Sequence, residues 1–213
     1  MPRQYRNKLT WDEVEGANAY VVVCNGEVID STIDTKYITE TSAFYREYCV
    51  KAINDKTESF TSNVIAFYPQ STISIDAARL GKKGNIKANG FNGKGYIELS
   101  KKANTSVQSN IKVAEPGKYL VQARYSNGSG PDNTDNKCAI RTLWINGQKA
   151  GVMVMPQRGK DEWSNWGYTN LIEVELKKGK NQLQLSFEDY NNNMNGEVNT
   201  ALLDEFRLIP KER

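Results

Sequence analysis

Histidine is absent from this chain of 213 residues. It is the commonest general base, the commonest metal ligand and the usual partner of a catalytic serine or cysteine. Its absence excludes these roles for histidine and leaves carboxylate, lysine and tyrosine side chains as the available acid–base groups.

Long apolar runs, cysteine and clustered charge are scarce as well. No run reaches the roughly 18 apolar residues that a membrane helix needs, and residues 1–5 lack the apolar region of a signal peptide. Three cysteines without ligand-like spacing, Cys24, Cys49 and Cys138, leave at least one thiol unpaired, and we expect them to be buried as small apolar residues. The net charge is +3 and the lysines are scattered, which argues against a nucleic-acid partner.

Helical periodicity is nearly absent, whereas short alternating runs bounded by glycine, asparagine, aspartate and proline recur throughout. This pattern predicts an all-β chain. Asn25-Gly26 and Asn146-Gly147 each stand between two strand-like runs and predict hairpins. A proline followed by small polar residues at 69–72 predicts a boundary between two domains, residues 1–69 and 70–213.

The turn from Asp161 to Tyr168 contains two tryptophans, Trp163 and Trp166. Because a turn lies on the surface, large aromatic side chains there need a core to pack in or a ligand to stack on. Residues three apart on a strand cannot point the same way. We therefore expect Trp166 to pack in the core and Trp163 to face a ligand.

A second unusual turn, 189–199, combines Tyr190 with a cluster of asparagines. Amides that donate and accept hydrogen bonds beside flat aromatic faces are suited to sugar recognition. A turn this rich in asparagine can equally be a solvated connection that uses left-handed conformations. The sequence leaves both alternatives open.

Residues 5–68 resemble a fibronectin type III domain. The resemblance rests on a tryptophan strand at 9–11, the pattern Gly-Ala-x-x-Tyr at 16–20, the pattern Tyr-x-Val-x-Ala-x-Asn at 48–54 and a serine-rich last strand at 59–62. It implies a β-sandwich with Trp11 between two sheets, acting as a spacer or docking module.

Residues 73–209 resemble a carbohydrate-binding module of the family 6 and family 35 type. The resemblance rests on seven motifs that fall in the expected order: Gly95-Tyr-Ile97, Glu115-Pro-Gly-Lys-Tyr119, Arg124-Tyr-Ser-Asn-Gly128, Asn146-Gly147, Trp163-x-x-Trp166, Leu176-x-x-Gly-x-Asn181 and Leu203-Asp-x-Phe206. The residues of this segment run as about nine short strands with no helix between them, which predicts a two-sheet sandwich. The resemblance implies a galactose-binding-like jelly roll. Asn127, within the third motif, is expected to cap a turn.

The same resemblance implies a sugar cleft formed by loops at one end of the sandwich. By position its tyrosine is Tyr96 and its tryptophan is Trp163, with Trp166 as second choice. The polar partner falls among three asparagines, because strand-like residues stand directly before Asp204: Asn193, Asn195 and Asn199.

The resemblance further implies a structural calcium ion held by Asp76 and Asp204. Ala78 stands where a second acid is usual in the first strand. Calcium takes six to eight oxygen ligands, so backbone carbonyls would have to complete this site.

Together these resemblances imply a non-catalytic module that holds the catalytic domain of a larger exported polysaccharide-processing protein near its glycan, a plant-type polysaccharide or oligosaccharide. The expected location is extracellular, periplasmic or the cell surface, with no membrane span. A glycosidase would need two acids about 5–9 Å apart, and no spacing marks such a pair. The alternative is a structural or protein-contact pair of β-sandwiches without glycan binding.

Overall fold

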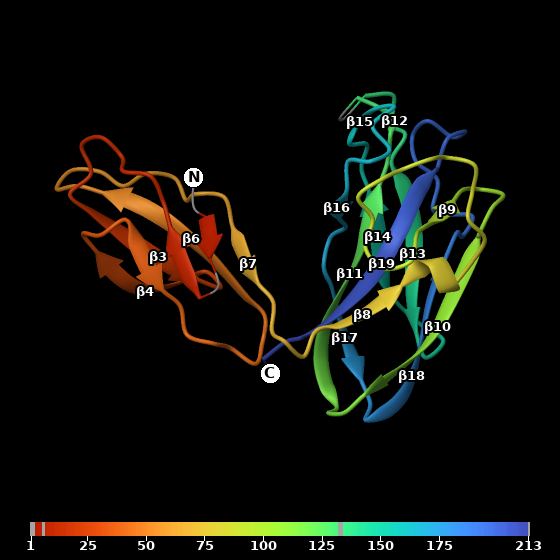
Figure 1. The fold of residues 1–213 in the computed structure, drawn as a ribbon, viewed down its shortest axis with the longest axis horizontal. Helices are drawn as coiled ribbons and strands as arrows, with labels where there is room; N and C mark the ends of the chain where they lie inside the picture. The colour runs from red at the N-terminus through yellow and green to blue at the C-terminus, as the bar shows by residue number, and fades with distance from the viewer. Residues whose placement is uncertain (1–2, 6, 132–133, 213) are drawn as a thin grey trace. The chain divides into compact units, whose positions relative to one another are not determined.

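The computed structural model describes residues 3–5, 7–131 and 134–212 (Figure 1). The described residues form strands and one 3-10 turn, η1 (Ala77–Arg79), and contain no α-helix, which confirms the all-β prediction. The chain divides into two compact units between Ser71 and Thr72. Within the described part, no helix has the length and apolar character needed to cross a membrane.

The first unit consists of two antiparallel sheets. One has the strand order β1 (Arg3–Tyr5), β2 (Lys8–Thr10), β5 (Lys36–Ile38), and the other the order β4 (Glu27–Thr32), β3 (Ala19–Cys24), β6 (Arg46–Ile53), β7 (Ile65–Phe67). The expected Asn-Gly hairpin joins β3 to β4, with positive φ at both Asn25 (50°) and Gly26 (89°), as a tight two-residue hairpin turn requires.

The core of the first unit is built around Trp11, which is buried with apolar residues of β2, β3 and β6. Its ring meets that of Tyr20 edge-on, with ring centroids 5.5 Å apart. The serine-rich run does not form the expected last strand. Instead the hydroxyls of Ser59 and Ser62 accept hydrogen bonds from the β6 amides of Ala52 and Val50, at 3.0 and 2.9 Å. The likeness to a fibronectin type III domain stays a prediction.

The described part of the second unit has twelve strands, which are the nine expected from the sequence and three strands of two residues each. A four-stranded sheet has the order β10 (Ser106–Val113), β18 (Gly179–Ser186), β13 (Ala139–Ile145), β14 (Gln148–Met155). The other sheet has the order β16 (Gly167–Tyr168), β11 (Gly117–Ser126), β19 (Ala201–Pro210), β8 (Ile73–Asp76), with β17 (Ile172–Leu176) paired to β11 and β9 (Ile97–Leu99) paired to β19. A small ladder pairs β12 (Ser129–Gly130) with β15 (Gly159–Lys160).

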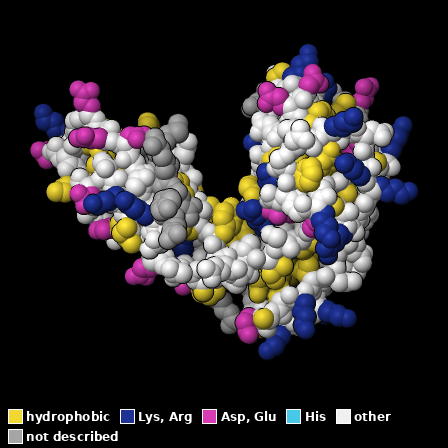
Figure 2. Space-filling model, viewed as in Figure 1, with side chains coloured by type: hydrophobic (Ala, Val, Ile, Leu, Met, Phe, Trp, Pro, Cys, Tyr) yellow, Lys and Arg dark blue, Asp and Glu magenta, His cyan; other side chains and the backbone are white. Residues whose placement is uncertain are grey.

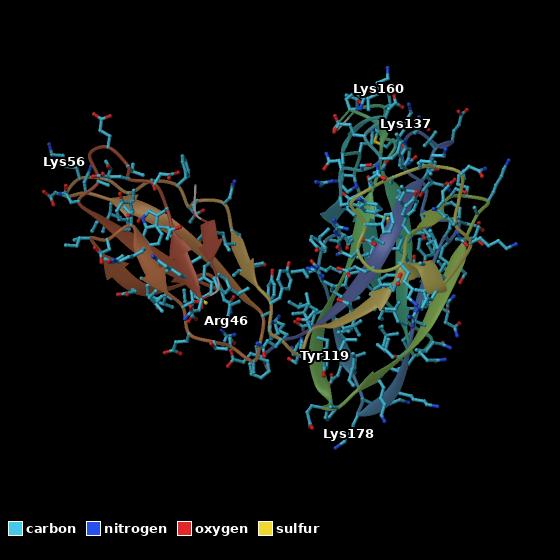
Figure 3. The ribbon with its side chains drawn as sticks, viewed as in Figure 1. Arg46, Lys56, Tyr119, Lys137, Lys160 and Lys178 are labelled. Carbon is cyan, nitrogen blue, oxygen red and sulfur yellow. The ribbon has the colours of Figure 1, made fainter. Side chains whose placement is uncertain are left out.

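Inward-facing apolar residues of both sheets form one core, as expected for a sandwich. The Asn146-Gly147 hairpin joins β13 to β14, again with positive φ at both residues. Lys137 and Lys160 lie at one end of the unit and Tyr119 and Lys178 at the other (Figure 3). We call the end with Lys137 and Lys160 the loop end. On the face drawn in Figure 2, basic side chains are scattered over this unit.

A β-bulge in β19 changes which side chains face outward. Arg124 of β11 pairs with Glu205 and Tyr125 pairs with Leu203, so Asp204 is the extra residue. Core residues stand at 201 and 203 before the bulge and at 206 and 208 after it. Because a bulge shifts the alternation by one residue, Asp204 and Glu205 both leave the core face.

The three cysteines are free thiols. We expected them to be buried, but each is only half-buried. Burial raises the pKa of Cys24, Cys49 and Cys138. All three are therefore poor nucleophiles at neutral pH.

Candidate functional site

Three aromatic residues that the sequence analysis singled out, Tyr96, Trp163 and Trp166, pack in one small cluster of the second unit with Ala88 and Leu202. Phe91 joins them, with its ring centroid 5.4 Å from that of Tyr96. The Tyr96 and Trp166 centroids are 5.8 Å apart. We call Phe91, Tyr96, Trp163 and Trp166 the aromatic cluster.

Tyr96 is the buried member of this cluster. Its side chain is buried, and its hydroxyl accepts a hydrogen bond from Ala88 N and donates one to Ile86 O, both at 2.8 Å. The ammonium of Lys83 lies 5.3 Å from its ring centre. In this arrangement Tyr96 holds the 86–88 segment and has no open ring face for stacking, unlike the role its position implied.

Trp163 is half-buried and lies against glycine. A Cβ atom on Gly128 would fall 2.8–2.9 Å from three atoms of the Trp163 ring, so one indole face packs on the Gly128 backbone. The backbone bond from Asp161 N to Gly128 O, at 2.9 Å, ties the two segments together. Because residue 128 has no side chain, the Trp163 ring can lie directly against the backbone there.

Trp166 is half-buried and held from several directions. Its Nε1 donates to Asn89 O at 2.6 Å, and the guanidinium carbon of Arg124 lies 5.2 Å from its ring centre. It also packs on Tyr96. These contacts make Trp166 a packed member of the cluster with one part still accessible.

The segment 89–94 was missed by the sequence analysis. It carries Phe91, whose side chain is 36% exposed, between two glycines with positive φ, Gly90 (72°) and Gly93 (60°). Asn89 N donates to Ser164 Oγ at 2.9 Å, which joins this segment to the tryptophan turn. The sequence signal was available, because Asn-Gly-Phe-Asn-Gly is also an aromatic residue inside a turn-forming run.

A buried ion pair lies under this segment. The Asp204 side chain is fully buried and forms a salt bridge with Arg124 Nη1. Asn92 N donates to both Asp204 oxygens, at 3.1 and 3.0 Å, and Arg124 Nη2 donates to Gly90 O at 3.1 Å. Burial raises the pKa of Asp204, while the Asn92 amide and Arg124 lower it less strongly. We call Arg124 and Asp204 the clasp.

The contacts of Asp76 and Asp204 do not fit a calcium ion. Asp76 accepts from Ala78 N and from Lys94 N, both at 3.0 Å, and so caps η1 and the 89–94 segment. Asp204 faces N–H groups rather than the several oxygens that calcium takes. No group of three acidic, cysteine or histidine side chains among the described residues is placed to hold a metal. The calcium expectation therefore finds no support here.

The asparagine-rich turn is not part of the aromatic cluster. Asn193 Nδ2 donates to Cys138 O and Val198 O, both at 2.6 Å, and Asn195 Oδ1 accepts from Val198 N at 2.9 Å. Asn199 is buried and accepts from Ile140 N at 3.0 Å. None of the asparagines from 191 to 199 has a positive φ. Asn199 thus joins the turn to β13, Asn193 joins it to the residue before β13, and Asn195 closes the turn on itself. Neither sequence alternative described this use of the amides.

Arg141 explains why this turn needs amides. It is 1% exposed and points inward from β13, where Nη1 donates to Ile140 O at 2.7 Å and also contacts Asn199 Oδ1. Desolvation lowers the pKa of Arg141 to about 10. In the part of the chain that is described, Arg141 Nε and Asn191 Nδ2 are buried without a hydrogen-bond partner.

Asn127 also has a structural role, because it accepts from Ser129 N at 3.0 Å and caps a turn as expected.

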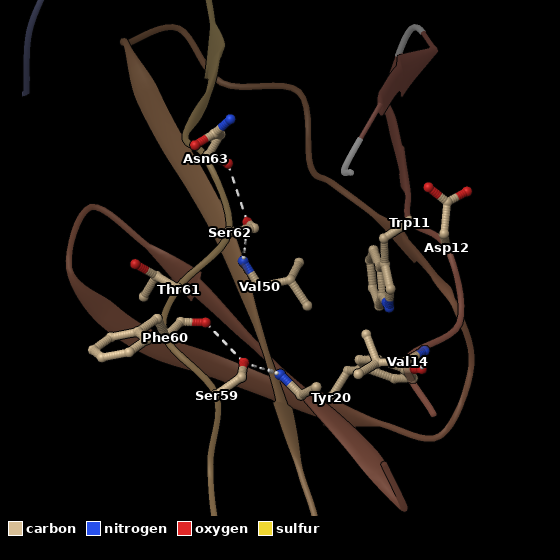
Figure 4. Close-up of a pocket in the computed structure, with 11 residues that line it drawn as sticks. Trp11, Asp12, Val14, Tyr20, Val50, Ser59, Phe60, Thr61, Ser62 and Asn63 are labelled. Carbon is tan, nitrogen blue, oxygen red and sulfur yellow. Dashed lines mark hydrogen bonds between the residues drawn. The ribbon is translucent and has the colours of Figure 1, made fainter. Parts of the chain in front are cut away.

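Several grooves lie outside the aromatic cluster. One, of about 490 Å³, lies in the second unit, and its lining includes Gln157, Arg158 and Tyr168. Another, of about 350 Å³, lies in the first unit between Trp11 and the 59–63 segment (Figure 4). Phe60 on its rim is 98% exposed, and the buried Trp11 Nε1 has no hydrogen-bond partner among the described residues.

No family model matches the chain. Among curated proteins, it is 28% identical over 130 residues to a cycloisomaltooligosaccharide glucanotransferase of Niallia circulans and 25% identical over 115 residues to an isomaltosyltransferase of Sporosarcina globispora. The matched parts make up 59% and 52% of this chain but only 12% and 10% of these relatives.

Among solved structures, the chain is similar to a cycloisomaltooligosaccharide glucanotransferase of a Paenibacillus species in complex with cycloisomaltoheptaose, with a TM-score of 0.50 and 21% identity over 63% of this chain and 18% of that one. A family 35 carbohydrate-binding module from an environmental isolate gives a TM-score of 0.48 and 20% identity over 65% of this chain and 93% of the module. The first of these shows the fold, a β-sandwich that also occurs within a glucanotransferase.

Proposed function

We propose that the second unit binds a glycan without catalysing a reaction on it, as an accessory part of a larger exported polysaccharide-processing protein. The observation that carries this proposal is the aromatic cluster. Phe91 is partly exposed, Trp163 and Trp166 are half-buried, and hydrogen-bonded segments hold all three.

The expected affinity follows from the area available. One face of a pyranose ring is made of C–H groups, and burying about 100–150 Å² of apolar surface on an aromatic face contributes about 2.5–4 kcal/mol. This corresponds to a Kd of about 1 mM or weaker for one contact. Polar groups such as the Asn89 and Ser164 side chains would have to supply specificity through the sugar hydroxyls.

The names of the relatives favour isomaltooligosaccharides, linear or cyclic, as the ligand class. Plant-type polysaccharides are the second choice. An accessory module that binds such a glycan would raise the local concentration of substrate around a catalytic domain on the same chain.

Two acids near the aromatic cluster, Glu98 and Asp204, have structural partners. Glu98 accepts from Asn85 N at 3.1 Å, and Asp204 is buried in the clasp. A pair of carboxylates in a cleft, as a glycosidase requires, would need at least two acids free to act. These contacts support binding without catalysis.

The test is a glycan panel on the whole chain, led by linear and cyclic isomaltooligosaccharides. Trp163→Ala is expected to weaken binding about tenfold or more. The matched control is Trp144→Ala, because Trp144 is a half-buried tryptophan of the other sheet whose Nε1 donates to Ser186 Oγ at 2.8 Å. Absence of binding by the unmodified chain would contradict the function, and equal losses in both variants would contradict the location.

A protein-contact role is the second candidate, and one observation favours it for the first unit. Large apolar side chains there are exposed, including Ile33 at 82% and Phe60 at 98%. Exposed apolar patches often mark protein contacts. If concentration-dependent sedimentation of the chain is lost in Ile33→Ser or Phe60→Ser, this candidate gains weight for the first unit.

A further inference from the structure

The segment 89–94 has little regular structure of its own, yet the aromatic cluster depends on it. Its backbone is hydrogen-bonded at four residues to side chains from elsewhere in the fold. Trp166 Nε1 donates to Asn89 O, Arg124 Nη2 to Gly90 O, Asn92 N donates to Asp204, and Lys94 N to Asp76 Oδ2. Phe91, the most exposed aromatic residue of the cluster, lies between two of these anchors.

One side chain reaches three of the parts that must be aligned. The Arg124 guanidinium contacts Asp204 on β19, donates to Gly90 O, and lies 5.2 Å from the Trp166 ring centre. A guanidinium can do this because it presents several N–H donors in one rigid plane, whereas a lysine ammonium is a compact point charge on a flexible stem.

The bulge in β19 makes this arrangement possible. It turns the Asp204 carboxylate out of the core and under the 89–94 segment, where the side chain is 0% exposed. A carboxylate buried to this degree needs a positive partner and hydrogen-bond donors. Arg124 and the Asn92 amide supply both.

We propose that Arg124 positions the 89–94 segment, and through it the aromatic cluster, by its contacts with Asp204 and Gly90, and that no divalent cation is needed for this. The inference rests on the proposed glycan binding for its functional consequence. The positive partner of Asp204 is a side chain of the protein and not a bound ion, so a chelator cannot remove it and the site would keep its shape in the presence of one. A guanidinium also carries its charge at every working pH.

The positioning can be tested without any glycan. Amide hydrogen exchange of Asn92 is followed in the whole chain with calcium and with EDTA. We expect equal protection in the two buffers, and a drop of about tenfold or more in the double variant Arg124→Met/Asp204→Leu, which removes both charges and leaves neither buried alone. The control is Lys118→Met, because Lys118 lies on the same strand as Arg124 and pairs with Glu173 at 2.7 Å.

A second measurement separates positioning from mere stability. Arg124→Lys keeps a positive charge beside Asp204 but not the planar fork that reaches Gly90 O. We expect this variant to keep a melting midpoint near that of the unmodified chain, to change the near-ultraviolet circular dichroism of the tryptophans, and to weaken glycan binding about tenfold.

The outcomes separate the two proposals. If EDTA lowers Asn92 protection, a cation takes part and the inference is wrong. If the double variant keeps Asn92 protection, or if Arg124→Lys binds glycan like the unmodified chain, Arg124 does not position the segment. If the unmodified chain binds no glycan, the proposed function fails, while the exchange result still decides whether the clasp holds the segment.

Discussion

Gly128→Ala is the sharpest test of how Trp163 is placed. The added Cβ would lie 2.8–2.9 Å from three atoms of the Trp163 ring, whereas carbon atoms in contact prefer about 3.5–4.0 Å. Gly128 does not have a positive φ, so alanine can adopt its backbone conformation, and only the contact with the Trp163 ring is unfavourable. The ring must move outward by about 0.5–1 Å or leave its place, which costs about 1–3 kcal/mol. For a unit of this size we expect the melting midpoint to fall by about 3–10 °C.

The assay is glycan affinity by titration calorimetry, together with the near-ultraviolet circular dichroism of the tryptophans. Gly147→Ala is the matched control, in the β13–β14 hairpin of the same unit. A Cβ atom at Gly147 would meet nothing within 4 Å, but the φ of 78° makes alanine destabilising by about 1–2 kcal/mol. We expect Gly128→Ala to lose about tenfold in affinity and Gly147→Ala to lose none. A Gly128→Ala variant with an altered dichroism spectrum but unchanged affinity would refute Trp163 as the stacking face.

Three further predictions concern charge and burial. Arg124→Met should destabilise the second unit by about 3–5 kcal/mol because Asp204 is left buried without a counter-ion, and adding Asp204→Leu should restore most of this loss in urea denaturation. Asn199→Ala should cost about 2–4 kcal/mol by removing the acceptor of the buried Arg141, while Asn195→Ala on the same turn, half-buried, should cost less than about 1 kcal/mol in the same assay. Hydrogen bonds from Lys118 and Lys211 lower the pKa of Glu173 to about 2, below its ordinary value near 4.5. Stabilisation by Glu173 is then present above about pH 4.5 and lost as the pH falls towards about 2, so the small melting difference between the unmodified chain and Glu173→Gln should vanish over that range; a constant difference would argue against these ion pairs.

The strands could be predicted because their signals are local. Alternation of apolar and polar residues marked nine of the twelve strands described in the second unit, all but the two-residue strands β12, β15 and β16, and Asn25-Gly26 and Asn146-Gly147 marked two hairpins. The exception was the serine-rich run of the first unit. Ser59 and Ser62 complete the β6 ladder with their hydroxyls, and such side-chain bonds compete with regular strand pairing in a way that no alternation pattern reveals.

The candidate site was predicted only in part, because its contacts join residues far apart in the chain. The tryptophan turn was found from its composition, and Phe91 could have been found by the same argument. The clasp could not, since Arg124 and Asp204 stand 80 positions apart and meet through a bulge. A weak signal existed in Asp204-Glu205, two adjacent acids inside an apolar strand, where an alternating pattern allows one outward residue.

The asparagine-rich turn shows why amide content alone does not locate a sugar site. An amide that binds a sugar must be accessible, but Asn191 and Asn199 are 1% and 2% exposed and bond to β13 and to each other's segment. Arg141 explains their burial. Its guanidinium points into the sandwich, and a buried charged group needs hydrogen-bond acceptors close to it, which the turn supplies. The polar partners of the proposed site must therefore come from exposed residues beside the aromatic cluster, and Asn89 and Ser164, exposed and joined by a hydrogen bond of 2.9 Å across the two segments, are placed for that role.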